Sequence, residues 1–171
     1  MIIGITGAQG SGKTLLTSMF AYRYFSKRDS EIFANYELNF DHKPLCMKDI
    51  ENADFDFNNS VLAVDEIHLF LDSRTSGTKK NRLISYFITQ SRKRNIIFIY
   101  TTQHAHQVDK RLRSNTDYII QCRNLSPKDA KKDITIQWTI HDMEGHKSKH
   151  LFKADPFFKL YITRQIIDFT K

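Results

Sequence analysis

Residues Gly7 to Thr14 read Gly-Ala-Gln-Gly-Ser-Gly-Lys-Thr, a complete Gly-x-x-x-x-Gly-Lys-Thr phosphate loop of the Walker A type. In such a loop the glycines let successive backbone N–H groups point at phosphate oxygens, while Lys13 supplies a mobile cation and the Thr14 hydroxyl can ligate Mg²⁺. The apolar run 1–5 before the loop and the helical spacing of 15–22 after it supply the strand and helix that the motif requires. We therefore predict that a nucleoside triphosphate binds to Gly7, Ala8, Gln9, Gly10, Ser11, Gly12, Lys13 and Thr14.

Further apolar runs predict an α/β sheet flanked by helices. The predicted strands are 31–36, 60–66, 96–103 and 117–122, and the predicted helices are 15–27, 47–52, 81–91 and 106–113. Within the predicted strand 60–66, residues 61–64 are continuously apolar and two acids follow them, which describes a strand buried on both faces with carboxylates at its tip. Alternation over 134–140 and a turn at 144–145 predict a C-terminal β-hairpin with a partner strand at 148–152.

Length and composition favour one intracellular domain. The chain has 171 residues, 40% of them hydrophobic, so we expect a single domain with a core at 1–125 and the β-hairpin and tail at 126–171. No stretch approaches the roughly 20 apolar residues of a membrane span, and Met1 leads directly into a strand. The two cysteines, Cys46 and Cys122, lie in no metal-ligand spacing and are expected to be reduced thiols. These features predict a soluble protein of the cytoplasm.

The net charge is +7, and the positive residues gather in blocks. The main blocks are 79–82, 92–94, 110–113, 128–132 and 147–153. Such blocks suit a polyanionic partner such as DNA or RNA, and a solvated basic surface is the alternative.

Hydrolysis of a nucleotide needs a carboxylate that organises the metal and a group that polarises water. Asp65 at the strand tip would hold Mg²⁺ through water, and Glu66 would polarise the attacking water. The alternative for this pair is an acidic start to a helix beginning at Ile67. Gln103 ends a buried strand and could contact both the γ-phosphate and the lytic water, or it could be an ordinary polar strand end.

Two pairs of arginines flank the strand 96–103. Arg92 and Arg94 precede it. Arg111 and Arg113 follow it, and either pair could reach the γ-phosphate of a neighbouring subunit as an arginine finger. The alternative is that these side chains are surface charges or contacts to DNA phosphates.

Taken together, the segments 7–14, 61–68 and 92–97, with the strand-terminal Gln103, resemble the FtsK/HerA group of P-loop ATPases. The resemblance covers residues 1–125 and is greatest to the zonula-occludens-toxin-like and viral DNA-packaging branches. It implies a RecA-like sheet with an additional strand, subunits that form rings, and ATP turnover that moves double-stranded DNA.

Site roles follow from the same resemblance. Lys13 and Thr14 would bind phosphate and Mg²⁺, and Asp65 would organise the metal. Glu66 would activate water and Gln103 would be the sensor. Arg92 or Arg94 would be the preferred finger, because both stand just before the sensor strand.

The resulting prediction is an ATP-hydrolysing DNA-translocating motor, namely a viral genome-packaging ATPase that acts as a ring oligomer. Its expected partners are double-stranded DNA, further copies of itself and a viral capsid or portal component, in the host cytoplasm or in the virion. The basic segments 74–82 and 110–113 are the candidates for the DNA face. The chain lacks the membrane segment of phage assembly proteins and the DNA-reading regions of chromosome translocases, which favours a minimal packaging motor.

Other functions use the same loop. The main alternative is a zonula-occludens-toxin-like assembly or secretion ATPase that acts on protein or single-stranded DNA. A small-molecule kinase is disfavoured by the adjacent acids and by the lack of an arginine-rich lid, and a GTPase by the lack of an Asn-Lys-x-Asp motif. A scaffold that binds ATP without turnover is disfavoured because Lys13, Asp65 and Glu66 are all present.

Overall fold

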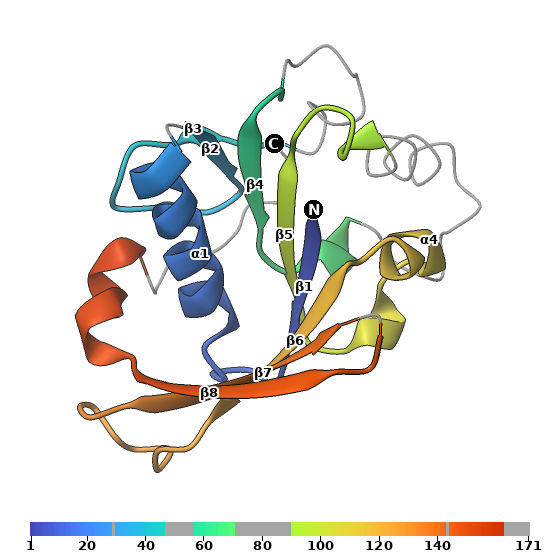
Figure 1. The fold of residues 1–171 in the computed structure, drawn as a ribbon. Coiled ribbons are helices and arrows are strands. Elements are labelled where there is room, and N and C mark those ends of the chain that lie inside the picture. Colours follow the sequence, from blue (N-terminus) through green and yellow to red (C-terminus); the bar gives the residue numbers. More distant parts are fainter. Residues whose placement is uncertain (29, 47–56, 71–89, 143, 163–171) are drawn as a thin grey trace.

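The computed structural model describes residues 1–28, 30–46, 57–70, 90–142 and 144–162 (Figure 1). Within these residues the chain forms one eight-stranded sheet. Its strands are β1 (Ile2–Thr6), β2 (Glu31–Ala34), β3 (Lys43–Pro44), β4 (Ser60–Val64), β5 (Ile97–Thr102), β6 (Tyr118–Asn124), β7 (Thr135–Asp142) and β8 (Lys147–Lys153). The α-helices are α1 (Lys13–Arg28) and α4 (Lys110–Ser114), and the 3-10 helices are η1 (Ile67–Leu69), η3 (Ala105–Gln107) and η4 (Asp155–Leu160).

The strand order is β3-β2-β4-β5-β1-β6-β7-β8. All pairs from β3 to β6 are parallel, and the pairs that join β6, β7 and β8 are antiparallel. β5 lies between β1, which leads into the phosphate loop, and β4, which ends at the two acids. This is the additional strand of a RecA-like sheet, so the predicted α/β fold is confirmed. The predicted C-terminal hairpin is also present, as β7 and β8.

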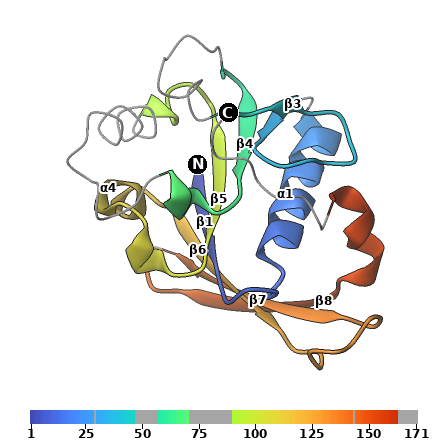
Figure 2. The same ribbon diagram turned by 180° about the vertical axis from the view of Figure 1, so that it is seen from behind.

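Two apolar layers cover the two faces of the central strands. On one face α1 packs through Leu16 and Ala21 onto a cluster that includes Val61, and on the other α4 packs through Leu112 onto a cluster that includes Leu62. Figures 1 and 2 show α1 and α4 on opposite sides of the sheet. Because successive strand residues point to opposite faces, a strand covered on both sides must be apolar throughout, and every residue of β4 is buried.

Several elements are shorter than their sequence patterns predict. The strand predicted over 31–36 ends at Ala34, and the side chain of the next residue, Asn35, binds the backbone of Asp65. The helix expected from Ile67 is the 3-10 turn η1. The basic helix predicted over 106–113 divides into η3 and α4, since Asp109 caps α4 by accepting the Arg111 N–H at 2.8 Å.

Two of the predicted helices and one basic loop fall mainly on residues that the structure does not describe. The short helix at 47–52, nearly all of the helix at 81–91 and the basic segment 74–82 belong to this group. The other predicted DNA segment, 110–113, forms most of α4.

The C-terminal strands bring distant residues to the phosphate loop. β7 and β8 cross below the start of α1 in Figure 1, and η4 then turns back beside α1. The turn between the strands is closed by Asp142, whose carboxylate accepts the N–H groups of Glu144 at 3.0 Å and His146 at 2.9 Å. After η4, Tyr161 forms an isolated antiparallel bridge with Leu38. Near the end of the described chain, Tyr161 lines the same cavity as Glu66.

Candidate active site

The phosphate loop joins β1 to α1 in a conformation that depends on its glycines. Gly7, Gly10 and Gly12 have φ angles of 152°, 72° and 94°, which L side chains rarely adopt. A Cβ atom on Gly7 would lie 2.5 Å from the Cys122 carbonyl oxygen and 2.5 Å from the Ser11 hydroxyl oxygen. The loop therefore holds a curved backbone at the start of α1, where the first helical N–H groups have no intrahelical partners.

Two buried polar side chains of the loop suit an anion. The Lys13 side chain is 6% exposed; its ammonium donates to the Ala8 carbonyl oxygen at 3.2 Å and lies 4.0 Å from Glu66 Oε1. The Ser11 hydroxyl is buried and has no hydrogen-bond partner within the described residues. Because buried polar groups are normally satisfied, this cation and this hydroxyl fit a bound phosphate group.

Asp65 stands at the tip of β4 and is held from three sides. The Thr14 hydroxyl donates to its carboxylate at 3.0 Å and 3.2 Å, and the Thr101 hydroxyl donates to Asp65 Oδ1 at 2.5 Å. Asn35 Nδ2 donates to the Asp65 carbonyl oxygen at 3.0 Å, and the Asp65 N–H donates to Asn35 Oδ1 at 2.7 Å. The carboxylate is thus fixed beside the Thr14 hydroxyl, and oxygen donors of this kind are the ligands that Mg²⁺ prefers.

Glu66 follows in a left-handed conformation, with φ 51° and ψ 52°. Its N–H donates to the Thr101 hydroxyl oxygen at 2.9 Å, so one hydroxyl contacts both acids. Its carboxylate lies between two groups that can be cationic, with Oε1 4.0 Å from Lys13 Nζ and Oε2 3.2 Å from His68 Nδ1. A non-glycine residue in this conformation costs about 1–3 kcal/mol and is typical of functional sites.

Sequence reasoning missed two residues that fix the acids. Thr101 carries a signal in the sequence, because two successive threonines end an otherwise apolar strand. Asn35 carries none, because only the order of the strands places β2 beside β4.

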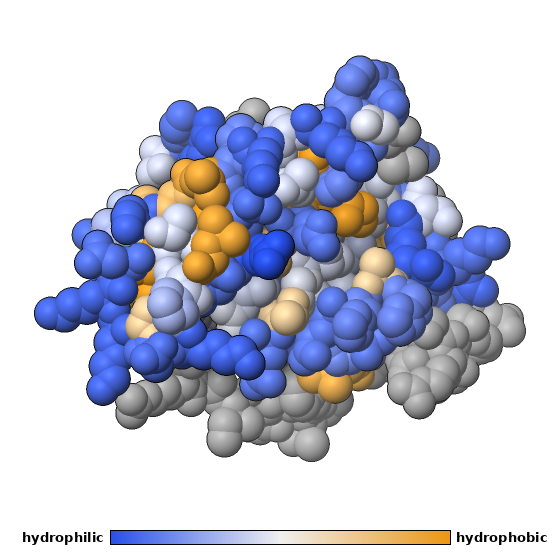
Figure 3. All heavy atoms as spheres, turned by 90° about the horizontal axis from the view of Figure 1, so that it is seen from below, coloured by the Kyte–Doolittle hydropathy of each residue, from blue (hydrophilic) through white to orange (hydrophobic). Residues whose placement is uncertain are grey.

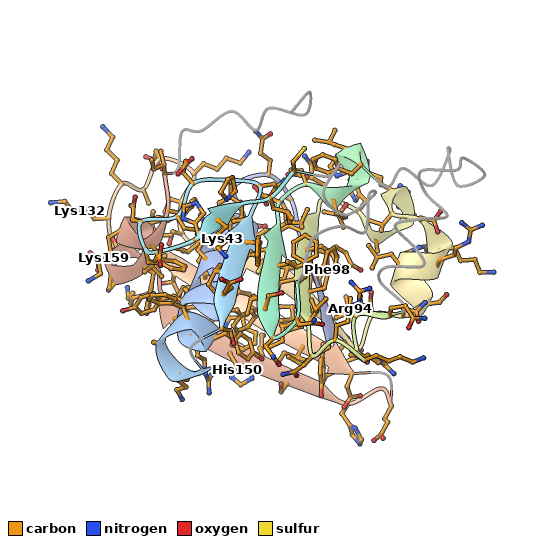
Figure 4. The ribbon with its side chains drawn as sticks, turned by 90° about the horizontal axis from the view of Figure 1, so that it is seen from above. Lys43, Arg94, Phe98, Lys132, His150 and Lys159 are labelled. Atoms are coloured by element: carbon orange, nitrogen blue, oxygen red, sulfur yellow. The ribbon has the colours of Figure 1, made fainter. Side chains whose placement is uncertain are left out.

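The remaining predicted residues lie at opposite ends of the parallel strands. Gln103 directly follows the carboxyl end of β5 and is half-buried, at the strand ends that carry the phosphate loop. Arg92 and Arg94 precede the amino end of the same strand, and Figure 4 labels Arg94 there. The Arg92 guanidinium pairs with Asp117, whose other oxygen accepts the Ile2 N–H at 2.7 Å. A strand of this length spans about 20 Å, so neither arginine meets a phosphate bound in its own loop.

A cavity of about 290 Å³ adjoins the phosphate loop. Its lining includes the polar or charged side chains of Lys13, Thr14 and Glu66 and the apolar or aromatic side chains of Ile134, Ile136, Phe158 and Tyr161. Burial, and to a lesser extent the charge of Asp65, raises the pKa of Tyr161 to about 12, so its phenol keeps its proton at neutral pH. The cavity thus joins a charged corner to an apolar wall, which is the combination that a nucleotide requires.

A known ATPase family matches most of the chain. The model of the ATPase family associated with various cellular activities (AAA) matches residues 3–124. No sequence among the curated proteins matches this chain. Among the helices that the structure describes, none is long and apolar enough to cross a membrane.

Solved structures share the fold at low sequence identity. The N-terminal domain of zonular occludens toxin from Neisseria meningitidis is 20% identical, with a TM-score of 0.70 over 94% of this chain and 98% of that one. The DNA-packaging ATPase B204 of Sulfolobus turreted icosahedral virus is 18% identical, with a TM-score of 0.61 over 87% of this chain and 96% of that one. The genome packaging NTPase B204 of Sulfolobus turreted icosahedral virus 2, in complex with ATP-γS, is 16% identical, with a TM-score of 0.61 and the same coverage.

Proposed function

The chain belongs to the ATPase family associated with various cellular activities (AAA), and we propose that it is an ATP-hydrolysing motor that translocates double-stranded DNA as a ring of identical subunits, in the packaging of a viral genome. The observation that carries this proposal is the contact between the phosphate loop and the two acids. Thr14 Oγ1 lies 3.0 Å from Asp65 Oδ2, and Lys13 Nζ lies 4.0 Å from Glu66 Oε1. The likeness to a DNA-packaging ATPase supports DNA as the cargo. A capsid or portal partner, in the host cytoplasm or in the virion, goes with that role.

In this proposal the loop residues Gly7 to Thr14 bind the triphosphate of ATP. Lys13 exchanges its weak contact with the Ala8 carbonyl oxygen, at 3.2 Å, for a phosphate oxygen. The buried Ser11 hydroxyl then gains a partner. The apolar wall of the cavity, with Tyr161 at its edge, provides room for the base and ribose.

Asp65 and Thr14 would hold Mg²⁺, because the Asp65 carboxylate at the tip of β4 lies beside the Thr14 hydroxyl of the phosphate loop and both offer oxygen atoms. The bound ion would neutralise charge on the β- and γ-phosphates. The Thr101 hydroxyl and the Asn35 amide keep Asp65 in place, so these two residues set the position of the metal ligand.

Glu66 would act as the general base toward the attacking water. Its side chain is 24% exposed, so water reaches it, and Lys13 lies on the side from which the phosphate is held. His68 Nδ1 lies 3.2 Å from the other carboxylate oxygen, which is buried and makes no hydrogen bond within the described residues. Gln103, at the same edge of the sheet, would sense whether the γ-phosphate is present.

Arg92 and Arg94 support a ring rather than a single active subunit. Both lie at the amino ends of the parallel strands, and the phosphate loop lies at the carboxyl ends. Either arginine could therefore contact only the ATP bound to a neighbouring subunit. Hydrolysis would then require assembly, which couples ATP turnover to the geometry of a ring.

A second candidate is an assembly or secretion ATPase that acts on protein or single-stranded DNA. The likeness to the zonular occludens toxin domain, which covers more of this chain than the viral packaging structures do, favours it. A preference for duplex over single-stranded DNA separates the two candidates.

The deciding experiment is ATP turnover across a series of protein concentrations, with and without duplex DNA, using Lys13→Ala as the blank. We expect turnover per subunit to rise steeply with concentration and to be stimulated by duplex. Turnover that is independent of concentration and indifferent to nucleic acid would contradict the motor and point to a kinase or a protein-directed ATPase.

A further inference from the structure

The antiparallel part of the sheet, β6 to β8, has two chemically different faces. On one face the register aligns Cys122 with Trp138 and Trp138 with His150, and Trp138 packs edge-on against Phe20 of α1. Side chains alternate between faces along a strand, so the intervening residues form the opposite surface. We call this surface the outer face; it consists of Ile119, Gln121, Arg123, Thr135, Gln137, Thr139, His141, Lys147, Lys149, Leu151 and Lys153.

The outer face carries positive charge without any carboxylate of its own. Arg123, Lys147, Lys149 and Lys153 are all exposed, and no aspartate or glutamate stands at an outer-face position. Asp133 lies 3.7 Å from the Lys153 ammonium, but both side chains are exposed, so the pair is weak. Lys147 and Lys149 are two residues apart on β8, about 6.8 Å along the strand, which suits successive phosphates, and the exposed Leu151 separates them from Lys153.

The surface on this side of the molecule is mainly hydrophilic. Figure 3 looks from below onto the side where β7 and β8 lie and shows blue hydrophilic atoms around separate apolar patches. Within the described sheet, β8 is the last strand, so no further strand pairs with its outer edge. Lys147, Lys149 and Lys153 are all exposed in the described part of the chain, so an approaching polyanion can reach them.

The residue types of the outer face select among nucleic acids. Proteins that bind single strands stack bases on aromatic side chains. No Phe, Tyr or Trp stands at an outer-face position; Trp138 and His150 stack on each other on the opposite face, with ring centroids 4.4 Å apart. Amide and hydroxyl groups such as those of Gln121 and Thr139 can donate to phosphate oxygens without reading bases. This chemistry fits the backbone of a duplex.

We propose that the outer face of β6, β7 and β8 binds the phosphate backbone of duplex DNA, independently of sequence. The proposal rests on the motor function proposed above and assigns its DNA contact to a surface other than α4. Arg123 also lines a cavity of about 460 Å³ together with Gln9 and Ser11 of the phosphate loop. DNA on the outer face therefore lies beside the nucleotide loop, and β6 connects the two sites.

The test compares two triple variants by fluorescence anisotropy with a labelled blunt-ended duplex over a range of salt concentrations. The outer-face variant is Lys147→Gln, Lys149→Gln, Lys153→Gln. The matched control, Lys27→Gln, Lys43→Gln, Lys159→Gln, removes the same three charges from the net +7 at exposed positions elsewhere. Thermal melting of both variants checks that each one folds.

We expect the outer-face variant to bind duplex at least 10-fold more weakly than the control. The slope of its log affinity against log salt should fall by about 0.9 for each DNA phosphate that a lysine no longer neutralises. Its ATP turnover without DNA should equal that of the control, whereas stimulation by duplex should be lost. Wild-type protein should prefer duplex to a single strand of the same length.

Equal duplex affinity and salt slope in the two variants would overturn the proposal, and the lysines would then only protect the sheet edge from pairing. Equal or tighter binding of single strands by wild-type protein would overturn the duplex assignment. A failure of the motor itself is distinct, because wild-type protein would then bind duplex more tightly than the outer-face variant without any stimulation of its ATP turnover.

Discussion

At the scale of single residues, Thr101 links the two acids of the site. Its hydroxyl donates to Asp65 Oδ1 at 2.5 Å and accepts the Glu66 N–H at 2.9 Å, and the residue is fully buried. A hydroxyl is the smallest group that can do both at once. In the proposed mechanism, position 101 therefore controls the placement of Asp65, the proposed metal ligand, and of Glu66, the proposed general base, together.

Thr101→Val, which keeps the shape but removes the hydroxyl, should lower ATP turnover about 100-fold, because small displacements of catalytic groups have effects of this size. Nucleotide affinity should stay nearly constant, since the phosphate loop is unchanged. Thr101→Ser should restore turnover. Parallel loss of binding and turnover, without rescue by serine, would indicate a merely structural role. Steady-state kinetics and titration with a fluorescent ATP analogue provide both values.

Glu66→Gln should abolish turnover and retain ATP binding, because the amide keeps the size of the side chain but cannot accept a proton from water. The left-handed backbone and the contact with Thr101 do not depend on the carboxylate. Normal turnover in this variant would remove Glu66 from the proposed role. Single-turnover hydrolysis of radiolabelled ATP is the direct measurement.

Gly7→Ala should cost far more stability than Gly10→Ala. A Cβ at Gly7 meets the Cys122 carbonyl oxygen at 2.5 Å, whereas a Cβ at Gly10 has no atom within 4 Å and meets only its φ of 72°. We expect about 1–2 kcal/mol for Gly10→Ala from the left-handed backbone alone, and a larger loss, with loss of ATP binding, for Gly7→Ala. Urea unfolding of the two variants decides, and equal losses would contradict the strained-loop geometry.

At the scale of elements, β5 runs from the arginines at its amino end to the site of the two acids at its carboxyl end. Its amino end follows the turn of Arg92 and Arg94, and its carboxyl end supplies Thr101 and leads into Gln103. In the proposed ring, a change near the arginines could therefore reach the acids through one strand. The proposed finger role requires the arginines and the phosphate loop that they serve to belong to different subunits, because the two lie at opposite ends of β5.

Mixing Arg94→Ala subunits with Glu66→Gln subunits should restore part of the ATP turnover that each variant lacks alone. In the mixture, a site with an intact Glu66 can receive Arg94 from its neighbour. Arg92→Ala mixed in the same way tests the other arginine. No recovery in either mixture, or full activity of both arginine variants alone, would contradict a finger at this turn. Turnover measured against the mixing ratio is the readout.

At the scale of the whole molecule, burial determines how stability depends on pH. Burial raises the pKa of Cys122 to about 12 from 9.0 and that of Tyr161 to about 12 from 10.0, and it also raises the pKa of Tyr36. The folded state therefore favours the neutral forms. Below about pH 9 the side chains of Cys122, Tyr161 and Tyr36 are protonated in both the folded and the unfolded state. Above about pH 9 the unfolded chain loses these protons first.

These buried groups should leave the free energy of unfolding unchanged below about pH 9 and lower it between about 9 and 12. Cys122→Ala, which removes one of these groups, should make the alkaline decline shallower. Urea unfolding at a series of pH values measures it. A stability that stays constant to pH 12 would show that these groups are not held neutral by the fold.

Much of the fold could be predicted from the sequence because its signals are local. The phosphate loop, the buried strand 60–64 and the alternation over 134–140 each depend on neighbours in the chain, and each has its counterpart in the structure. Helix lengths were harder to predict, since Asp109 interrupts the basic segment by capping a new helix. The described turn after Glu66 is a 3-10 turn, whereas the alternative for the acids is a helix beginning at Ile67.

Local residue patterns alone identify the groups that this protein offers to a nucleotide: Lys13, Thr14, Asp65 and Glu66 stand in patterns that a phosphate and a metal require. How these groups meet depends on the order of the strands. Parallel strands that are far apart in the chain end at one edge of the sheet, so Thr101 and Asn35 reach Asp65 from β5 and from the end of β2. The same sheet places Arg92 at the opposite edge and gathers the lysines of β8 on one face. The chemistry of each side chain follows from the residue itself. The distances between side chains, and the face of the sheet on which each one lies, depend on the order of the strands, which no local sequence pattern contains.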